Sequence, residues 1–324
     1  MKKILLASTA LVLSAVAANA QAFNVTGEGR MGLRYNNSAA WAATNSGSAY
    51  MVENRLTLNF NVAVEADHGL SFGAFTRARM QMGGGAPAVY ASNQTAMFSG
   101  SRVWVEANGL RLTFGNQDGA IVQAGVAYGY AGGCGVGYVG GELCGDTAGL
   151  FPVAQLFNSV GPSGPQMVAL TYNMGDIRFA LSNGRGASTE LGIRGSFDAF
   201  TVALGYTNNR GASGNANYVL SGLYNGGSWT VGALVAKVDD STNTAGATVT
   251  TWNLRGTVAL GGGNLYGYVG RTVTAATAAA STDPSYGLSY GYGLGGGATL
   301  TVGAERVGGA TNTTAASVGV AFTF

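Results

Sequence analysis

Apolar and polar residues alternate with a period of two along most of the chain after residue 20. In the segment 23–35 every odd position is apolar or glycine, from Phe23 to Tyr35, whereas the even positions include Glu28 and Arg30. Because successive side chains of a β-strand point to opposite faces, this pattern predicts strands with one apolar and one polar face. Sixteen segments carry the pattern, which predicts an all-β protein. The expected strands are 23–35, 50–66, 69–82, 97–107, 110–115, 166–173, 177–182, 189–197, 200–207, 216–225, 228–237, 249–260, 264–271, 285–294, 298–306 and 315–324.

The connections between these strands alternate between short and long. The short ones, such as Asp67-His68, Asn108-Gly109 and Gly226-Gly227, have hairpin composition, and the long ones follow the odd-numbered strands. Outer-membrane barrels have short turns at the periplasmic rim and long loops outside. A soluble β-sandwich has no need of this asymmetry. The sequence therefore predicts a 16-stranded antiparallel transmembrane β-barrel with an apolar outer wall and a polar lumen.

The first 20 residues have the pattern of a secretory signal peptide. Lys2 and Lys3 precede an apolar core, and Ala18-Asn19-Ala20 supplies the small residues of a cleavage site. This stretch is shorter than the roughly 20 apolar residues that a spanning helix needs. We therefore expect residues 1–20 to be removed and residues 21–324 to form the barrel in the Gram-negative outer membrane.

The last expected strand alternates up to the final residue. Its apolar positions, which share one face suited to lipid, are Val318, Val320, Phe322 and Phe324. In a closed barrel this strand must pair with the first strand, because an open sheet edge in lipid leaves backbone groups without hydrogen bonds. We expect that pairing.

The composition suits a membrane barrel and excludes nucleic acid as a partner. The chain has 54 glycines and 5 prolines, and its charged fraction is 10%, well below that of a typical soluble domain. Without Lys2 and Lys3, 15 basic residues balance 15 acidic ones. A neutral mature chain has no basic surface for nucleic acid.

Several short motifs, in order along the mature chain, resemble the general diffusion porins of alphaproteobacteria. The motifs are Gly27–Tyr35, Gly69–Ala74, Tyr286–Tyr290, Leu294–Ala298 and the terminal Phe324. The resemblance implies a homotrimer of 16-stranded, water-filled barrels in which the third external loop folds inward to form a constriction. It also implies passive diffusion of ions and small hydrophilic solutes, with outer-membrane lipid around the barrel and no cofactor.

The segment 116–165 is the longest connection and hence the expected constriction loop. It contains both cysteines of the chain, Cys134 and Cys144. Because the exported compartment is oxidising, we expect them to form a disulfide. Two free thiols or a metal pair are the alternatives, but His68, the one further soft ligand, lies in an expected turn. We therefore expect no metal site.

Arginines are concentrated in the first five expected strands, and most share parity with the polar face. They are Arg30, Arg34, Arg55, Arg77, Arg79, Arg102 and Arg111. An arginine on the lipid face near mid-membrane costs about 2 to 4 kcal/mol, which favours the lumen. The loop supplies the opposite charge in Asp118, Glu142 and Asp146. These ten residues are the expected pore constriction, with a positive wall facing a negative loop.

An alternative is that the arginines form ion pairs within the lumen wall, which would stiffen it. The available partners are Glu28, Glu53, Glu65 and Glu106. We expect this for some of the seven arginines but not for all of them.

Enzymatic functions fit the sequence poorly, so we expect a protein that is not an enzyme. The single histidine cannot easily serve a Ser-His-Asp site, which also disfavours a lipase barrel. Gly135–Gly140 matches a dinucleotide-binding fingerprint but follows no expected strand. The alternative function is a surface-binding or adhesin-type barrel with a closed lumen, which would show no steady conductance.

Overall fold

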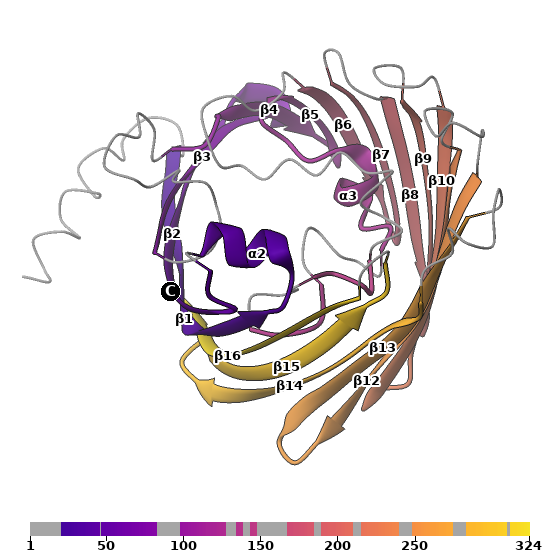
Figure 1. The fold of residues 1–324 in the computed structure, drawn as a ribbon. Helices are drawn as coiled ribbons and strands as arrows, with labels where there is room; N and C mark the ends of the chain where they lie inside the picture. Colours follow the sequence, from indigo (N-terminus) through magenta and orange to yellow (C-terminus); the bar gives the residue numbers. More distant parts are fainter. Residues whose placement is uncertain are drawn as a thin grey trace, which may run out of the picture.

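Sixteen antiparallel strands close into a single barrel (Figure 1). The computed structural model describes residues 21–45, 47–82, 98–127, 134–138, 143–147, 167–184, 189–209, 215–239, 248–274, 283–309 and 312–324. The strands are β1 Gln21–Asn36, β2 Tyr50–Glu65, β3 Ser71–Met82, β4 Arg102–Ala107, β5 Leu110–Gly115, β6 Met167–Met174, β7 Ile177–Gly184, β8 Thr189–Phe197, β9 Phe200–Asn209, β10 Asn215–Asn225, β11 Trp229–Asp239, β12 Thr248–Leu260, β13 Gly263–Thr274, β14 Ser285–Gly295, β15 Ala298–Val307 and β16 Thr313–Thr323. The expected fold class is confirmed.

The barrel closes between β1 and β16, as expected. Their register runs from Glu28 opposite Thr323 to Asn36 opposite Ala315. Beyond it, the Gly27 N–H donates to the Phe324 carbonyl oxygen at 2.8 Å. This pairing leaves neither strand with a free edge, which a membrane-spanning sheet requires.

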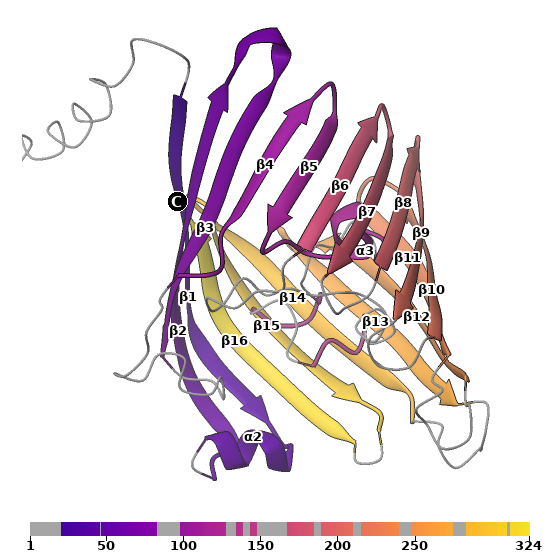
Figure 2. The same cartoon turned by 90° about the horizontal axis from the view of Figure 1, so that it is seen from above.

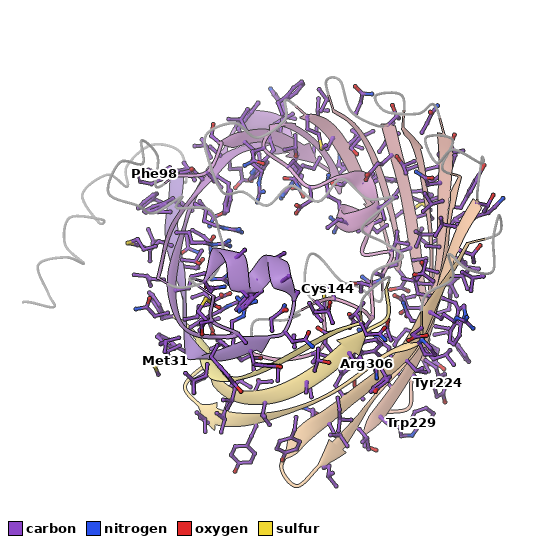
Figure 3. The ribbon with its side chains drawn as sticks, in the orientation of Figure 1. Met31, Phe98, Cys144, Tyr224, Trp229 and Arg306 are labelled. Atoms are coloured by element: carbon purple, nitrogen blue, oxygen red, sulfur yellow. A yellow bond between two sulfur atoms is a disulfide. The ribbon has the colours of Figure 1, made fainter. Side chains whose placement is uncertain are left out.

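The period-two alternation places apolar side chains outside and small or polar ones inside. On β10, Leu220 is 53% exposed, whereas its neighbours Val219 and Ser221 are 0% and 4% exposed. Figure 3 shows the same division, with Met31 and Trp229 outside the ring and Cys144 within it. The apolar outer surface therefore follows from the alternation along the strands and is not a local patch.

Tight turns join the strands at one rim. Between β4 and β5, Asn108 and Gly109 have φ of 49° and 78°, the positive values that a two-residue hairpin turn demands. Figure 2 shows the β2–β3 and β4–β5 hairpins at this rim and the helix α2 (Ala39–Thr44) at the opposite one. The short helix α3 (Ala120–Ala124) lies inside the ring of strands (Figure 1).

One expected strand is shorter than its pattern predicts. The segment expected at 97–107 forms a strand only from Arg102. Before that point, the Ser99 hydroxyl accepts the Arg77 N–H at 3.0 Å and so takes the place of a backbone carbonyl in the ladder. Phe98 makes only an isolated bridge to Ala78. Side-chain competition of this kind ends regular pairing.

The helices were not expected from the pattern. α2 begins after Ser38, whose hydroxyl accepts the Trp41 N–H at 3.2 Å, and a 3-10 turn η1 (Asp67–Gly69) follows β2. Among the helices that the structure describes, none has the length and apolarity to cross a membrane.

Candidate functional site: the lumen and its loop

The expected constriction loop returns into the barrel and packs on the inner wall through α3. The Ala120 N–H donates to the Ser182 hydroxyl of β7 at 2.8 Å, and the Ile121 N–H donates to the Glu190 carboxylate of β8 at 3.1 Å. α3 joins an apolar cluster with Ala203 of β9, among other wall residues. Position 192 of β8 must be glycine for α3 to pack this closely, because a Cβ there would lie 2.5 Å from the Ala120 carbonyl oxygen.

A second part of the loop packs on the opposite side of the lumen. Residues 134–138 and 143–147, here called the disulfide lobe, are joined by the Cys134–Cys144 disulfide, which confirms the expected bond. The Gly137 N–H donates to the Ser289 hydroxyl of β14 at 3.1 Å. The Tyr138 N–H donates to the Ser317 hydroxyl of β16 at 3.2 Å. The loop is thus attached at two separate places.

Glu305 of β15 also anchors the disulfide lobe. Its carboxylate accepts the Leu143 N–H at 2.6 Å and the Gly145 N–H at 3.2 Å, and it accepts the Tyr268 hydroxyl at 2.7 Å. Glu305 is 2% exposed, and Glu190 under α3 is 0% exposed. Sequence reasoning missed both acids, although each occupies an inward position of an alternating strand.

Asp146 anchors the disulfide lobe to the wall. It is 1% exposed, its carboxylate accepts the Gly135 N–H at 2.8 Å, and it also accepts the Tyr266 hydroxyl of β13. Its carboxylate is thus engaged within the lobe and with β13, and the expected position of Asp146 opposite the arginines stays a prediction. Glu142 lies outside the described residues.

The seven arginines lie on β1–β5, here called the arginine wall, whereas α3 attaches to β7–β9 and the disulfide lobe forms its hydrogen bonds with β13–β16 (Figure 1). Ion pairs within the wall join several of them to neighbouring acids. Arg30 and Arg55 both contact Glu28, the latter at 2.8 Å. Arg34 pairs with Glu53 at 2.8 Å, and Arg111 donates to Glu106 at 2.6 Å. The wall-stiffening alternative therefore applies to these four.

Arg77 and Arg102 differ from those four because an acid of the loop attracts both of them, although Glu28 of the wall also attracts Arg77. Both attract Asp118, which follows β5. The Arg102 guanidinium lies 3.9 Å from the Phe75 ring centroid, and Arg77 donates to Asn59 at 2.9 Å. Phe75, which is buried, thus supports the pair. Arg79 lies on β3 opposite Thr57 of β2.

The charge of Asp118 is set by two opposing effects. Burial raises the pKa of its carboxyl group, while Arg102 and Arg77 lower it, and the net direction is upward. Asp118 and these two arginines thus place charges of opposite sign at the start of the inward loop.

No group of three or more histidine, cysteine, aspartate or glutamate residues is placed to hold a metal ion in the parts of the chain that the structure describes.

A closed 16-stranded barrel with an apolar outer face and a loop folded into its lumen is the architecture of an outer-membrane channel. The chain belongs to the Gram-negative porin family, whose family model matches residues 7–312. It is therefore an outer-membrane protein that forms a channel for passive diffusion.

Individual relatives agree with this assignment. A porin of Fuscovulum blasticum is 24% identical over 314 residues, which are 93% of this chain and 99% of that protein. A triple mutant of the Rhodopseudomonas blastica porin has a similar structure, with a TM-score of 0.72 and 24% identity over 94% of this chain and 100% of that chain. A second mutant of the same porin matches with a TM-score of 0.73 at the same identity and coverage.

Proposed function

We propose that ions and small hydrophilic solutes cross this channel between the arginine wall and the loop segment that carries Asp118. The observation that carries the proposal is the electrostatic attraction between Asp118, at the start of the inward loop, and Arg77 and Arg102 on the wall strands β3 and β4. Hydrated ions and dipolar solutes fit such a field, whereas apolar solutes must displace oriented water.

The ten expected constriction residues have different roles in this proposal. Arg77, Arg102 and Asp118 set the field across the gap. The remaining arginines contribute positive potential and stiffen the wall, Asp146 holds the loop, and Glu142 adds negative charge to it. The remaining arginines of this set are Arg30, Arg34, Arg55, Arg79 and Arg111.

Conductance measurements on the purified protein test the proposal. In a planar bilayer we expect steady currents that rise in proportion to voltage and KCl concentration. A surface-binding barrel with a closed lumen would insert without steady current, and that result would overturn the proposal.

Transport requires no chemical step, so we also propose that the protein has no enzymatic activity. His68, the single histidine that a Ser-His-Asp site would have to use, lies in the exposed turn η1.

We further propose that the mature protein is a homotrimer. β4 and β5 have 6 residues each, fewer than the roughly 9 to 11 that a strand needs to cross a bilayer. Their outer face borders an apolar hollow of about 440 Å³ that includes Val103 and Phe114, which are 52% and 47% exposed. A second copy of the chain would cover this part of the wall, where the strands are short.

Native mass spectrometry in detergent tests the trimer. Val103→Arg should shift the trimer to monomers, because it places a charge in the subunit contact. Leu220→Arg is the matched control on the outer face of β10, where the lipid cost is similar but no contact is proposed. A wild-type monomer, or dissociation by both variants alike, would contradict the proposed contact.

Residues 1–20 lie outside the described residues, and we propose that they are a signal peptide cleaved before Gln21. Amino-terminal sequencing of the protein purified from outer membranes tests this directly. A mature chain that retains Lys2 and Lys3 would contradict it.

A further inference from the structure

Three arginines gather near the periplasmic turns, and two of them, Arg178 and Arg194, lie outside the proposed constriction. Arg178 of β7 and Arg194 of β8 are direct cross-strand partners. Arg178 is the second residue of β7, directly after the short turn at Gly175, and Arg111 is likewise the second residue of β5. The hairpins that contain them form the upper rim in Figure 2.

The cluster carries more positive than negative charge. Like charges directly opposite each other on a sheet are unfavourable, and Arg178 is repelled by both Arg194 and Arg111. Glu106 pairs with Arg111, but in the described part of the chain neither Arg178 nor Arg194 forms an ion pair. The Nε atoms of both are buried and have no hydrogen-bond partner among the described residues.

These side chains border a polar hollow of about 270 Å³. Asn173 and Ser196 also line it and can donate hydrogen bonds to a ligand. Asp176 is the one acidic residue of its lining, and it makes no ion pair with either arginine in the described residues. The hollow therefore combines two uncompensated guanidinium groups with neutral donors, a set that suits an oxyanion.

We propose that Arg178 and Arg194, with Arg111 beside them, form a binding site for soluble phosphate-bearing solutes at the periplasmic mouth of the channel. Guanidinium groups bind phosphate oxygens in pairs, and they retain their charge at every physiological pH. The site concentrates such anions where they leave or enter the lumen. This inference rests on the proposed function, because solutes reach the hollow only through a water-filled lumen.

The test uses inorganic phosphate as the probe in planar bilayers. At constant KCl activity, added phosphate should reduce the chloride current of the wild type in a saturable way. The double variant Arg178→Gln, Arg194→Gln should raise the half-saturating phosphate concentration about tenfold or more, since hydrogen bonds to charged groups are the stronger class. Glutamine preserves much of the length and the donor groups.

Arg255→Gln is the matched control, because Arg255 lies on an inward position of β12 beside Tyr266 and away from the cluster. The control should keep the wild-type half-saturating concentration. Heat-modifiable gel migration and KCl conductance show whether each variant is folded. A wild type that conducts KCl but shows no saturable phosphate effect would overturn the site. So would a folded double variant with an unchanged effect. A wild type that conducts no KCl would instead overturn the proposed function.

Discussion

At the scale of single residues, the charge of the lumen depends most on where each acidic side chain finds its partners. Arginines of the wall form ion pairs with Glu28, Glu53 and Glu106. The carboxylate of Asp146 accepts a hydrogen bond within the disulfide lobe. Asp118, at the start of the loop, is attracted by Arg102 and Arg77, and its burial raises its pKa. Its carboxylate therefore takes up a proton at a higher pH than an exposed aspartate would.

The ion selectivity of the channel should therefore depend on pH through Asp118. As the pH falls toward the raised pKa, the loop loses a negative charge while Arg77 and Arg102 stay charged, so cation selectivity should decrease. This decrease should begin above pH 3.8, the ordinary aspartate value. Reversal potentials under a KCl gradient, recorded from neutral to acidic pH, provide the measurement.

Asp118→Asn is the comparison for this pH titration. It lacks the ionisable group, so its reversal potential should already match the acidic wild type at neutral pH and should change little above pH 3.8. If wild type and variant show the same dependence on pH, another group controls the selectivity.

At the scale of elements, the loop packs closely against glycines of the wall strands, because a side chain there would occupy the space of the loop. A Cβ at Gly303 of β15 would lie 2.6 Å from the Gly137 backbone nitrogen, and one at Gly319 of β16 would lie 2.7 Å from the Tyr138 ring. The disulfide could be predicted from the sequence because only two cysteines exist. The attachment of the lobe to β13–β16 could not be predicted, since it depends on contacts between residues far apart in the sequence, such as 137 and 303.

Gly303→Ala should loosen the disulfide lobe without opening the barrel. The added methyl group displaces Gly137 and weakens the neighbouring hydrogen bond to Ser289, so we expect larger fluctuations of the open-channel current. Gly222→Ala on β10 is the control, because a Cβ there would meet nothing within 4 Å. Current noise equal to that of the control would show that this contact does not hold the loop.

At the scale of the whole molecule, closure of the barrel joins the two ends of the mature chain. The alternation of apolar residues and the turns such as Asn108-Gly109 were enough to predict all sixteen strands and the β1–β16 pairing. The roles of individual arginines were less predictable. Parity places Arg30 and Arg77 on the same polar face. Only the three-dimensional arrangement shows that Arg30 forms an ion pair with Glu28, whereas Asp118 of the loop attracts Arg77.

Removal of the last three residues should prevent closure. Phe322 pairs with Gly29, and the Phe324 N–H donates to the Gly27 carbonyl oxygen at 3.1 Å. Without them part of β1 would present unpaired backbone groups to lipid. The truncated protein should lose heat-modifiable migration on gels, whereas replacing Phe324 by Leu, which preserves the backbone hydrogen bonds, should retain it. Normal insertion and conductance of the truncated chain would contradict the closed-barrel account.

The field between the arginine wall and the loop is best tested by the reversal potential of the double variant Arg77→Gln, Arg102→Gln under a KCl gradient. Removing the two cations should raise cation selectivity at low salt, and the change should shrink near 1 M, where the Debye length is about 3 Å. Arg255→Gln should give a smaller change, because that residue lies on β12 away from Asp118. An unchanged reversal potential in the double variant at low salt would show that Arg77 and Arg102 serve only the structure of the wall.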